Sequence, residues 1–176
     1  MVALVDAPID VGAVIAAVAH GGAGGIAVFV GAVRDESDRR AVALLEYEAY
    51  RPMALAEMQR CVDELERTQP GPVRLAVTHR LGALKVGDVA VVCAASSAHR
   101  GEAFVACRAL IDAIKARVPI WKREHGPDGA YWVGWQDARC AGGDGEPGVA
   151  HGHAHDDESD HAPGDPGHEH APGKRR

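Results

Sequence analysis

The chain has 176 residues, 47% of them hydrophobic, and a formal net charge of −6. This length suits one domain, or one domain with a tail, and the apolar fraction is enough to form a core. No apolar run of about 18 residues is present, and no basic stretch followed by an apolar segment begins the chain. Neither a membrane-spanning helix nor a secretory signal peptide is therefore expected.

The first half of the chain contains both kinds of regular pattern. Apolar residues recur at a helical spacing over residues 10–20, which predicts a helix. Residues 25–34 are mostly apolar and predict a strand, and residues 34–40 form a charged loop. Over residues 41–50 apolar and charged side chains alternate, which is typical of a half-buried strand.

The second half continues this mixture of helices and strands. Pro52 suits the first turn of a helix that reaches about Thr68, and extended backbone is expected after Pro119 because proline does not continue a helix. The remaining predicted elements are strands at residues 73–80 and 88–95, a helix at 101–116 and a strand at 130–135. The order αββαββαββ predicts an α+β domain with a mixed or antiparallel sheet.

The composition changes sharply at residue 141. Residues 141–176 are dominated by Gly, Pro, Asp and His, and hold eight acidic and three basic residues, a net charge of −5. With almost no apolar side chains to bury, this segment cannot offset its ordering entropy, and a disordered tail after a domain of residues 1–140 is predicted. Those 140 residues hold 17 acidic and 16 basic residues, too even a balance for a general nucleic-acid surface.

Histidine is abundant in the tail. A His-x-His-x-His pattern at residues 151–155 precedes Asp156 and Asp157 and can bind a divalent metal. The ligand order matches no closed structural zinc site, so accessory metal binding and an inert solubilising tail both stay open. No resident metal or cofactor is expected.

Four cysteines stand at positions 61, 93, 107 and 140, without any C-x-x-C pair. Reduced thiols in a cytoplasmic protein are expected. Cys61 and Cys107 fall within helical patterns and Cys93 within an apolar strand, so these three are predicted to be buried small hydrophobic side chains.

The helix at residues 101–116 has an apolar stripe that comprises Ala103, Phe104, Cys107, Leu110, Ile111 and Ile114. Lys115 lies roughly 20° round the helix from Phe104, at the margin of this stripe. A lysine there is partly desolvated, which favours its neutral form and suits acid–base chemistry. The alternative is a lysine whose stem covers the core edge while its ammonium reaches water.

His99 and Arg100 stand where a strand gives way to this helix, and Ser96 or Ser97 can cap it. The unpaired N–H groups and dipole of a helix N-terminus, with an arginine beside them, suit a phosphate group. The alternative is a surface His–Arg pair at a helix start.

Lys122, Arg123 and Glu124 follow Trp121 on an extended segment. Strand alternation puts Lys122 and Glu124 on one face and Arg123 on the other. A solvated run of charge on an edge strand is the alternative. Arg34 ends an apolar strand, either as a binding residue or as a boundary charge.

Taken together, six segments resemble the large, catalytic subunit of molybdopterin synthase, in order and roughly in spacing. The segments are Phe-Val-Gly-Ala-Val-Arg (29–34), Leu-Glu-Tyr-Glu-Ala-Tyr (45–50), His-Arg-Leu-Gly (79–82), Ser-Ser-Ala-His-Arg (96–100), Lys-Ala-Arg-Val-Pro-Ile-Trp-Lys-Arg-Glu (115–124) and Tyr-Trp-Val (131–133). The resemblance covers about residues 8–136, and the segment 115–124 is its most specific part.

The resemblance implies an α/β hammerhead-type fold and a homodimer at the centre of a heterotetramer. Each end would bind a small ubiquitin-like sulfur carrier, whose C-terminal Gly-Gly thiocarboxylate would enter a pocket of this subunit. The substrate would be cyclic pyranopterin monophosphate, which receives two sulfur atoms and becomes the dithiolene of molybdopterin. Neither a ubiquitin-like domain nor a terminal Gly-Gly lies in this chain.

The same resemblance implies roles for individual residues. Lys115 and Lys122 would be the catalytic lysines. The substrate-binding residues would include both lysines and also Ala32, Val33, Arg34, His99, Arg100, Arg123 and Glu124, with Ala32–Arg34 offered across the dimer. The chain departs from the family pattern at Arg39, where the family usually has glycine, and in the His-rich tail.

Two other classes of function remain as alternatives. A non-catalytic sensor of a phosphorylated ligand would use the same basic residues but would tolerate the loss of Lys115. A metal-delivery protein would depend on the histidine tail and would lose its function on truncation at residue 141. The presence of two lysines favours the enzyme.

Overall fold

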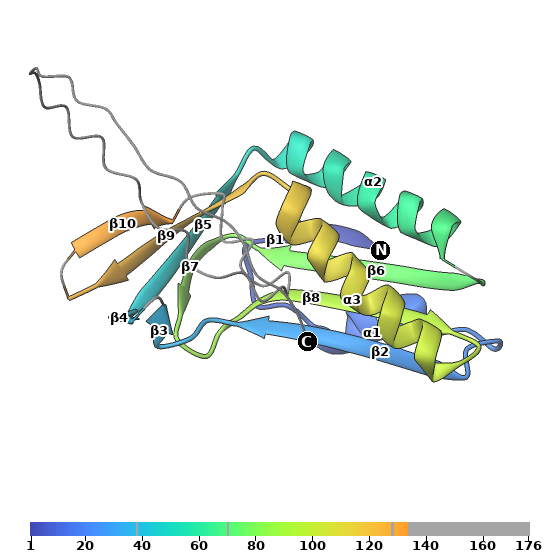
Figure 1. Ribbon diagram of the computed structural model, residues 1–176. Coiled ribbons are helices and arrows are strands. Elements are labelled where there is room, and N and C mark those ends of the chain that lie inside the picture. The colour runs from blue at the N-terminus through green and yellow to red at the C-terminus, as the bar shows by residue number, and fades with distance from the viewer. Residues whose placement is uncertain (38, 70, 128, 134–176) are drawn as a thin grey trace, which may run out of the picture. The chain divides into compact units, whose positions relative to one another are not determined.

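The computed structural model describes residues 1–37, 39–69, 71–127 and 129–133. All of them belong to the first of the two compact units into which the chain divides, Met1–Gly142. The helices of this part are α1 (Val11–Val18), α2 (Arg51–Thr68) and α3 (Arg100–Arg117). Two four-stranded sheets and a short hairpin accompany them (Figure 1).

The first sheet has the strand order β1-β6-β8-β2. Its strands are β1 (Val2–Val5), β6 (Val73–Arg80), β8 (Val89–Ser97) and β2 (Gly25–Ala32). The β1–β6 pair is parallel, whereas β6–β8 and β8–β2 are antiparallel. The sheet is therefore mixed, and β2 lies at one of its edges.

Helices cover both faces of this first sheet, with α2 and α3 on one face and α1 on the other (Figure 1). Successive side chains of a strand point to opposite faces, and β8 follows this rule. Cys93 packs in the cluster under α2 and α3, whereas Val92 and Ala94 pack in the cluster under α1. Because both of its faces are covered, β8 reads as a continuous apolar run in the sequence.

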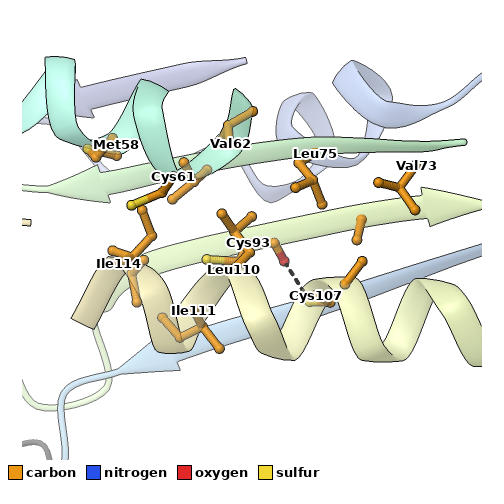
Figure 2. Close-up of a cluster of buried hydrophobic side chains, with 14 of the residues drawn as sticks. Met58, Cys61, Val62, Val73, Leu75, Cys93, Cys107, Leu110, Ile111 and Ile114 are labelled. Carbon is orange, nitrogen blue, oxygen red and sulfur yellow. Dashed lines mark hydrogen bonds between the residues drawn. The ribbon is translucent and has the colours of Figure 1, made fainter. Parts of the chain in front are cut away.

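The main core lies between α2, α3 and the first sheet (Figure 2). Met58 of α2 and Leu110 of α3 are fully buried in it. Truncation of such a side chain to alanine costs about 2–5 kcal/mol of folding stability. Cys107 donates its S–H to the carbonyl oxygen of Cys93 across this core, at 3.5 Å.

The second sheet is wholly antiparallel, with the order β10-β9-β5-β7. Its strands are β10 (Gly129–Val133), β9 (Ile120–Gly126), β5 (Leu44–Ala49) and β7 (Gly82–Lys85). A small cluster, Val33, Val42, Leu45, Leu84 and Ala90, joins it to the first sheet, and Tyr47 packs against this cluster. The hairpin of β3 (Glu36–Ser37) and β4 (Arg40–Ala41) precedes β5.

The predicted α+β class and the mixed and antiparallel sheets are confirmed, as are all three helices. Asp10 caps α1 by accepting a hydrogen bond from the Ala13 N–H at 3.0 Å, and Pro52 lies in the first turn of α2. Four strands, β1, β3, β4 and β7, were not predicted. Each has only two to four residues, too few for an alternating pattern to stand out.

Two expectations about α3 are wrong. Phe104 is 66% exposed and does not belong to the buried stripe. Neither serine caps the helix. Ser96 donates to the Val18 carbonyl and Ser97 donates to the Glu102 carboxylate, so the N-cap is His99, without a side-chain capping bond.

Three of the cysteines, Cys61, Cys93 and Cys107, are buried free thiols, as predicted. Cys140 and the whole tail of residues 141–176 lie outside the described residues. Within the described ranges, no helix has the length and apolar character needed to cross a membrane.

Candidate active site

Lys115 lies in the last turn of α3, the turn that precedes the Val118–Pro119 bend into β9. Its side chain is exposed, so the partial desolvation expected from the helical wheel is not found in the single chain. Arg117, two residues further on, fixes this turn to α2 through ion pairs of 2.8 Å with Glu57 and Glu64. The bend therefore starts from an anchored helix end.

Lys122 and Glu124 lie on the same face of β9, as strand alternation predicts. The Lys122 ammonium is 2.9 Å from the Glu124 carboxylate, whose side chain is almost completely buried. Burial alone would raise the pKa of Glu124. Hydrogen bonds from Tyr131 and Lys122, with a further one from Ser37, outweigh this effect and hold the Glu124 pKa below its ordinary value. Glu124 is therefore a buried carboxylate that orients Lys122.

His79 is the last but one residue of β6 and is 8% exposed. Its ring meets the ring of Tyr47 edge-on, with centroids 4.9 Å apart. Nδ1 lies 2.8 Å from the carbonyl oxygen of Arg80. Burial, partly opposed by this hydrogen bond, lowers the pKa of His79 to about 4, and the positive charge of Lys115 acts in the same direction. The imidazole is therefore neutral at physiological pH.

These side chains converge at one end of the first sheet. Tyr47 of β5 stands directly opposite Lys122 of β9, which puts both side chains on one face of the second sheet. Tyr47 contacts His79, and His79 is close enough to Lys115 for the lysine charge to shift its pKa. We call Lys115, Lys122, Tyr47, His79 and Glu124 the lysine cluster.

Arg123 lies on the opposite face of β9 from Lys122. Its guanidinium donates to the Glu46 carboxylate directly across the β5–β9 ladder and stacks over the Trp132 ring, 5.2 Å from the ring centroid. Hydrogen bonds from Arg123 and then His125 lower the pKa of Glu46, and the same carboxylate raises the pKa of Arg123. Within one chain, Arg123 is engaged away from the lysine cluster.

The segment Ala32–Arg34 leaves β2 at the same end of the first sheet. Val33 is buried in the cluster against which Tyr47 packs, whereas Ala32 and Arg34 are exposed. The β3–β4 hairpin follows directly and stacks Arg40 over the Tyr131 ring, 5.0 Å from its centroid. This segment is therefore tied to the lysine cluster through both its core residue and its hairpin.

Arg39 occupies the turn of that hairpin with φ of 64°, the left-handed region that glycine adopts without strain. A glycine, as the resemblance leads one to expect at this position, would adopt this conformation without strain. The chain keeps a hairpin in spite of the arginine, because Glu36 and Ala41 still pair.

His99 and Arg100 lie at the other end of α3. Lys115 follows Arg100 by fifteen residues of continuous helix, so their α-carbons are about 22 Å apart. Both side chains are exposed, and within the described residues neither makes an ion pair or a side-chain hydrogen bond. The backbone beneath them is closely packed, because a Cβ at Gly24 would lie 2.2 Å from the carbonyl oxygen of Ala98.

The structure thus brings together only some of the predicted site residues. Lys115, Lys122, Glu124 and Ala32–Arg34 gather at one end of the first sheet, whereas His99 and Arg100 lie at the opposite end. Sequence reasoning missed His79 and Tyr47 as site residues. Both lie within segments that resemble the enzyme family, which was the available indication. Among the described residues, no three His, Cys, Asp or Glu side chains form a group that could hold a metal.

The fold and the cluster define a class of protein: an α+β enzyme with two lysines, one of them paired with a buried carboxylate, at one end of its first sheet. The comparisons with known proteins name the family. The family model described as MoaE protein matches residues 4–117. The chain belongs to the MoaE family, and the molybdopterin synthase catalytic subunit expected from the sequence is confirmed at the level of the family.

Individual relatives agree with this assignment. The chain is 47% identical to molybdopterin synthase catalytic subunit 1 of Mycobacterium tuberculosis (strain ATCC 25618 / H37Rv) over 131 residues, 74% of this chain and 88% of the relative. It is 40% identical to the molybdopterin synthase catalytic subunit of Bacillus subtilis (strain 168), over 85% of this chain and 94% of the relative. A crystal structure of molybdopterin synthase from Staphylococcus aureus superposes with a TM-score of 0.71 at 37% identity, covering 74% of this chain and 95% of that one.

Proposed function

We propose that this protein transfers sulfur from the C-terminal thiocarboxylate of a small ubiquitin-like carrier protein to cyclic pyranopterin monophosphate. The product is the dithiolene of molybdopterin, the organic part of the molybdenum cofactor. The observation that carries the proposal is the lysine cluster, in which Lys122 pairs with the buried Glu124 and the positive charge of Lys115 acts on the buried His79. Membership of the MoaE family supports the same reaction.

Each lysine has a separate chemical task in this proposal. Attack by a thiocarboxylate develops negative charge on the group attacked, and a fixed cation stabilises it. Lys122 is suited to that task because the Glu124 carboxylate orients it. Lys115 is exposed at the end of α3 and serves as acid, base or second cation. Glu124 thus acts by orienting Lys122. Arg123 is the residue next to Lys122 on β9.

A complete site requires two copies of the chain. His99 and Arg100 suit the phosphate of the substrate, but about 22 Å of helix separates Arg100 from Lys115. One small molecule cannot contact both within a single chain. A homodimer in which the partner's α3 N-terminus lies beside the lysine cluster removes this difficulty.

The edge strand β2 offers a surface for such a homodimer. Ile26, Val28 and Val30 are 37–44% exposed on one face of β2, and α3, which packs against β2, carries the exposed Phe104 and Val105. A long unpaired apolar edge is a template for pairing with another strand. Antiparallel pairing of two β2 strands about a two-fold axis would exchange their ends. The Gly25 end, next to Arg100, would then lie beside Ala32–Arg34 of the second copy.

The carrier is a separate protein in this proposal, and two carriers on one homodimer make a heterotetramer. A Gly-Gly terminus suits a site between two chains, because glycine has no side chain to clash in a narrow passage. A cytoplasmic location is proposed with it, in line with the buried free thiols Cys61, Cys93 and Cys107.

Reconstitution tests the reaction directly. The full chain, a thiocarboxylated carrier and cyclic pyranopterin monophosphate should yield the dithiolene product, and absence of product would contradict the proposal.

A mixing experiment tests the shared site. Lys115→Ala and Arg100→Ala proteins should each be nearly inactive alone. After subunit exchange, half of the dimers are mixed and one of the two sites in each is intact, so about a quarter of the wild-type activity should return. No recovery, with exchange verified by mass spectrometry, would show that the residues do not act across a dimer.

A further inference from the structure

Each oxygen of the buried Glu124 carboxylate has a partner of its own. The Lys122 ammonium lies 2.9 Å from Oε1, and the Tyr131 hydroxyl donates a hydrogen bond to Oε2. Glu124 is only 1% exposed, so bulk water does not replace a donor that the carboxylate loses. The bond from Tyr131 at Oε2 therefore affects how Oε1 is presented to Lys122.

The backbone of the second sheet sets the position of the Tyr131 side chain. Tyr131 of β10 stands directly opposite Glu124 of β9. Lys122 comes two residues before Glu124 and so lies on the same face of the strand. Side chains that are directly opposed on an antiparallel pair are close neighbours. The pairing of β9 with β10 therefore brings the Tyr131 hydroxyl to the carboxylate that Lys122 uses.

The hairpin of β3 and β4 supports the Tyr131 ring. The guanidinium carbon of Arg40 lies 5.0 Å from the centre of this ring, within the range of a cation–π contact. Arg40 pairs with Ser37 in the hairpin, which follows the segment Ala32–Arg34. Tyr131 thus has its ring against the hairpin and its hydroxyl on Glu124.

The part of Tyr131 that matters for Lys122 is its hydroxyl rather than its ring. A phenylalanine would provide the same ring for Arg40 but would leave Oε2 of Glu124 without this donor. The terminal torsion of a glutamate side chain has only broad preferences of its own. A carboxylate bonded at both oxygens is held in one plane, and the direction from which it holds Lys122 is then fixed.

We propose that Tyr131 is a positioning residue for Lys122: its hydroxyl fixes the Glu124 carboxylate, and this carboxylate orients the Lys122 ammonium toward the substrate. Tyr131 needs no contact with the substrate in this role. The inference rests on the proposed function for its effect on catalysis, whereas the effect of Tyr131 on Lys122 can be measured without turnover.

Tyr131→Phe tests this role because it removes only the hydroxyl. We expect kcat to fall about tenfold, while KM for cyclic pyranopterin monophosphate stays within about twofold because the hydroxyl does not touch the substrate. Tyr50→Phe is the matched control, since Tyr50 is 61% exposed, and its kcat should equal that of wild type. An unchanged kcat in folded Tyr131→Phe, whatever its melting temperature, would overturn the proposal.

A second substitution separates action through Glu124 from a general weakening of the sheet. Glu124→Met keeps a similar side-chain volume but has no oxygen for Tyr131 to bond. If Tyr131 acts through the carboxylate, Tyr131→Phe should change kcat by less than about twofold in the Glu124→Met background. A further loss of about tenfold in that background would overturn the proposal.

Acylation of lysines by acetic anhydride, quantified by peptide mass spectrometry, reports on Lys122 without turnover. An ammonium whose acceptor is less firmly held loses its proton more readily, so the labelling rate of Lys122 should rise about threefold in Tyr131→Phe. The rate of the exposed Lys85 on β7 should not change.

Equal labelling of Lys122 in wild type and Tyr131→Phe would overturn the proposal. If the wild-type protein makes no dithiolene while the labelling of Lys122 responds as expected, the proposed function fails and the effect of Tyr131 on Lys122 stands.

Discussion

The two ends of helix α3 are built differently. At the C-terminal end, Arg117 bonds two glutamates of α2, and the positive charge of Lys115 acts on the buried His79. At the N-terminal end, His99 and Arg100 have exposed side chains with no ion pair in the described part of the chain. Their support is the close backbone packing at Gly24.

This difference separates residues that are held by contacts within one chain from residues that, in the proposed homodimer, would act on a neighbouring copy. The C-terminal end is organised by one chain alone. The N-terminal end presents two side chains to solvent at a fixed backbone position, which is what a contribution to a neighbouring copy requires. Changes at the two ends should therefore have different effects on activity and on stability.

The largest expected effect is the loss of Lys115. Lys115→Ala should lower kcat by about 100- to 1,000-fold, the usual cost of removing a group that stabilises developing charge. Its side chain is exposed, so the free energy of unfolding should stay within about 0.5 kcal/mol of wild type. Lys85→Ala is the matched control. Activity within a few-fold of wild type would remove Lys115 from the catalytic residues.

Acid should lower the free energy of unfolding through the buried His79. The pKa of His79 is about 4 in the folded chain and 6.5 is its ordinary value, so as pH falls below 6.5 the unfolded chain gains a proton that the folded chain does not. This contribution to stability is complete above pH 6.5, falls by about 2 kcal/mol at pH 5 and by about 3 kcal/mol below pH 4. Urea unfolding at pH 7 and pH 5 measures it.

The control for that measurement is His79→Asn, which should lose the same increment of acid sensitivity. Buried carboxylates such as Glu124 also lose stability in acid, because their folded pKa lies below its ordinary value. The difference between wild type and His79→Asn isolates the histidine. An identical pH dependence in both proteins would mean that His79 is protonated in the folded chain.

A smaller effect is expected from the ion pairs that anchor α3 to α2. Arg117→Met should lower the free energy of unfolding by about 1 kcal/mol, since partly exposed charge pairs contribute modestly. Arg100→Met, the matched change at the other end, should leave it unchanged while weakening the binding of the pterin phosphate in calorimetry. Equal destabilisation by both changes would abolish the distinction between the ends.

The smallest effect is expected from the tail. Deletion of residues 141–176 should leave the melting temperature and the rate of sulfur transfer essentially unchanged, because the segment has almost no apolar side chains to pack. A large drop in either quantity would show that the tail contributes to one of the two ends or to the assembly.

Long periodic elements could be predicted from the sequence, because the residue pattern within each element is sufficient to identify it. The spacing of Val14 and Val18, the proline at the start of α2 and Pro119 after α3 each act within a few residues. Alternation also predicted the opposite faces of Lys122 and Arg123. The strand β1 gave no such pattern, because its parallel pairing with β6 depends on contacts more than 70 residues apart.

The site was only partly predictable for the same reason. The helical wheel gives the direction of Lys115 but not what lies above it, and the apolar Phe104 was assigned to the core although it is exposed. His79 is a single polar residue at a strand end. Its burial depends on Tyr47 from another sheet, a contact that no local pattern in either strand encodes.

The reactivity of the buried thiols can report the unfolding of the chain. Cys61, Cys93 and Cys107 come from α2, β8 and α3, and burial raises the pKa of each of them. Thiolates are the species that alkylating agents attack, so all three should be protected while the core between these elements is closed. Brief exposure to iodoacetamide, followed by peptide mass spectrometry, would show whether α2 separates from the sheet before α3. The native cysteines serve as the probes, so no engineered tag is needed.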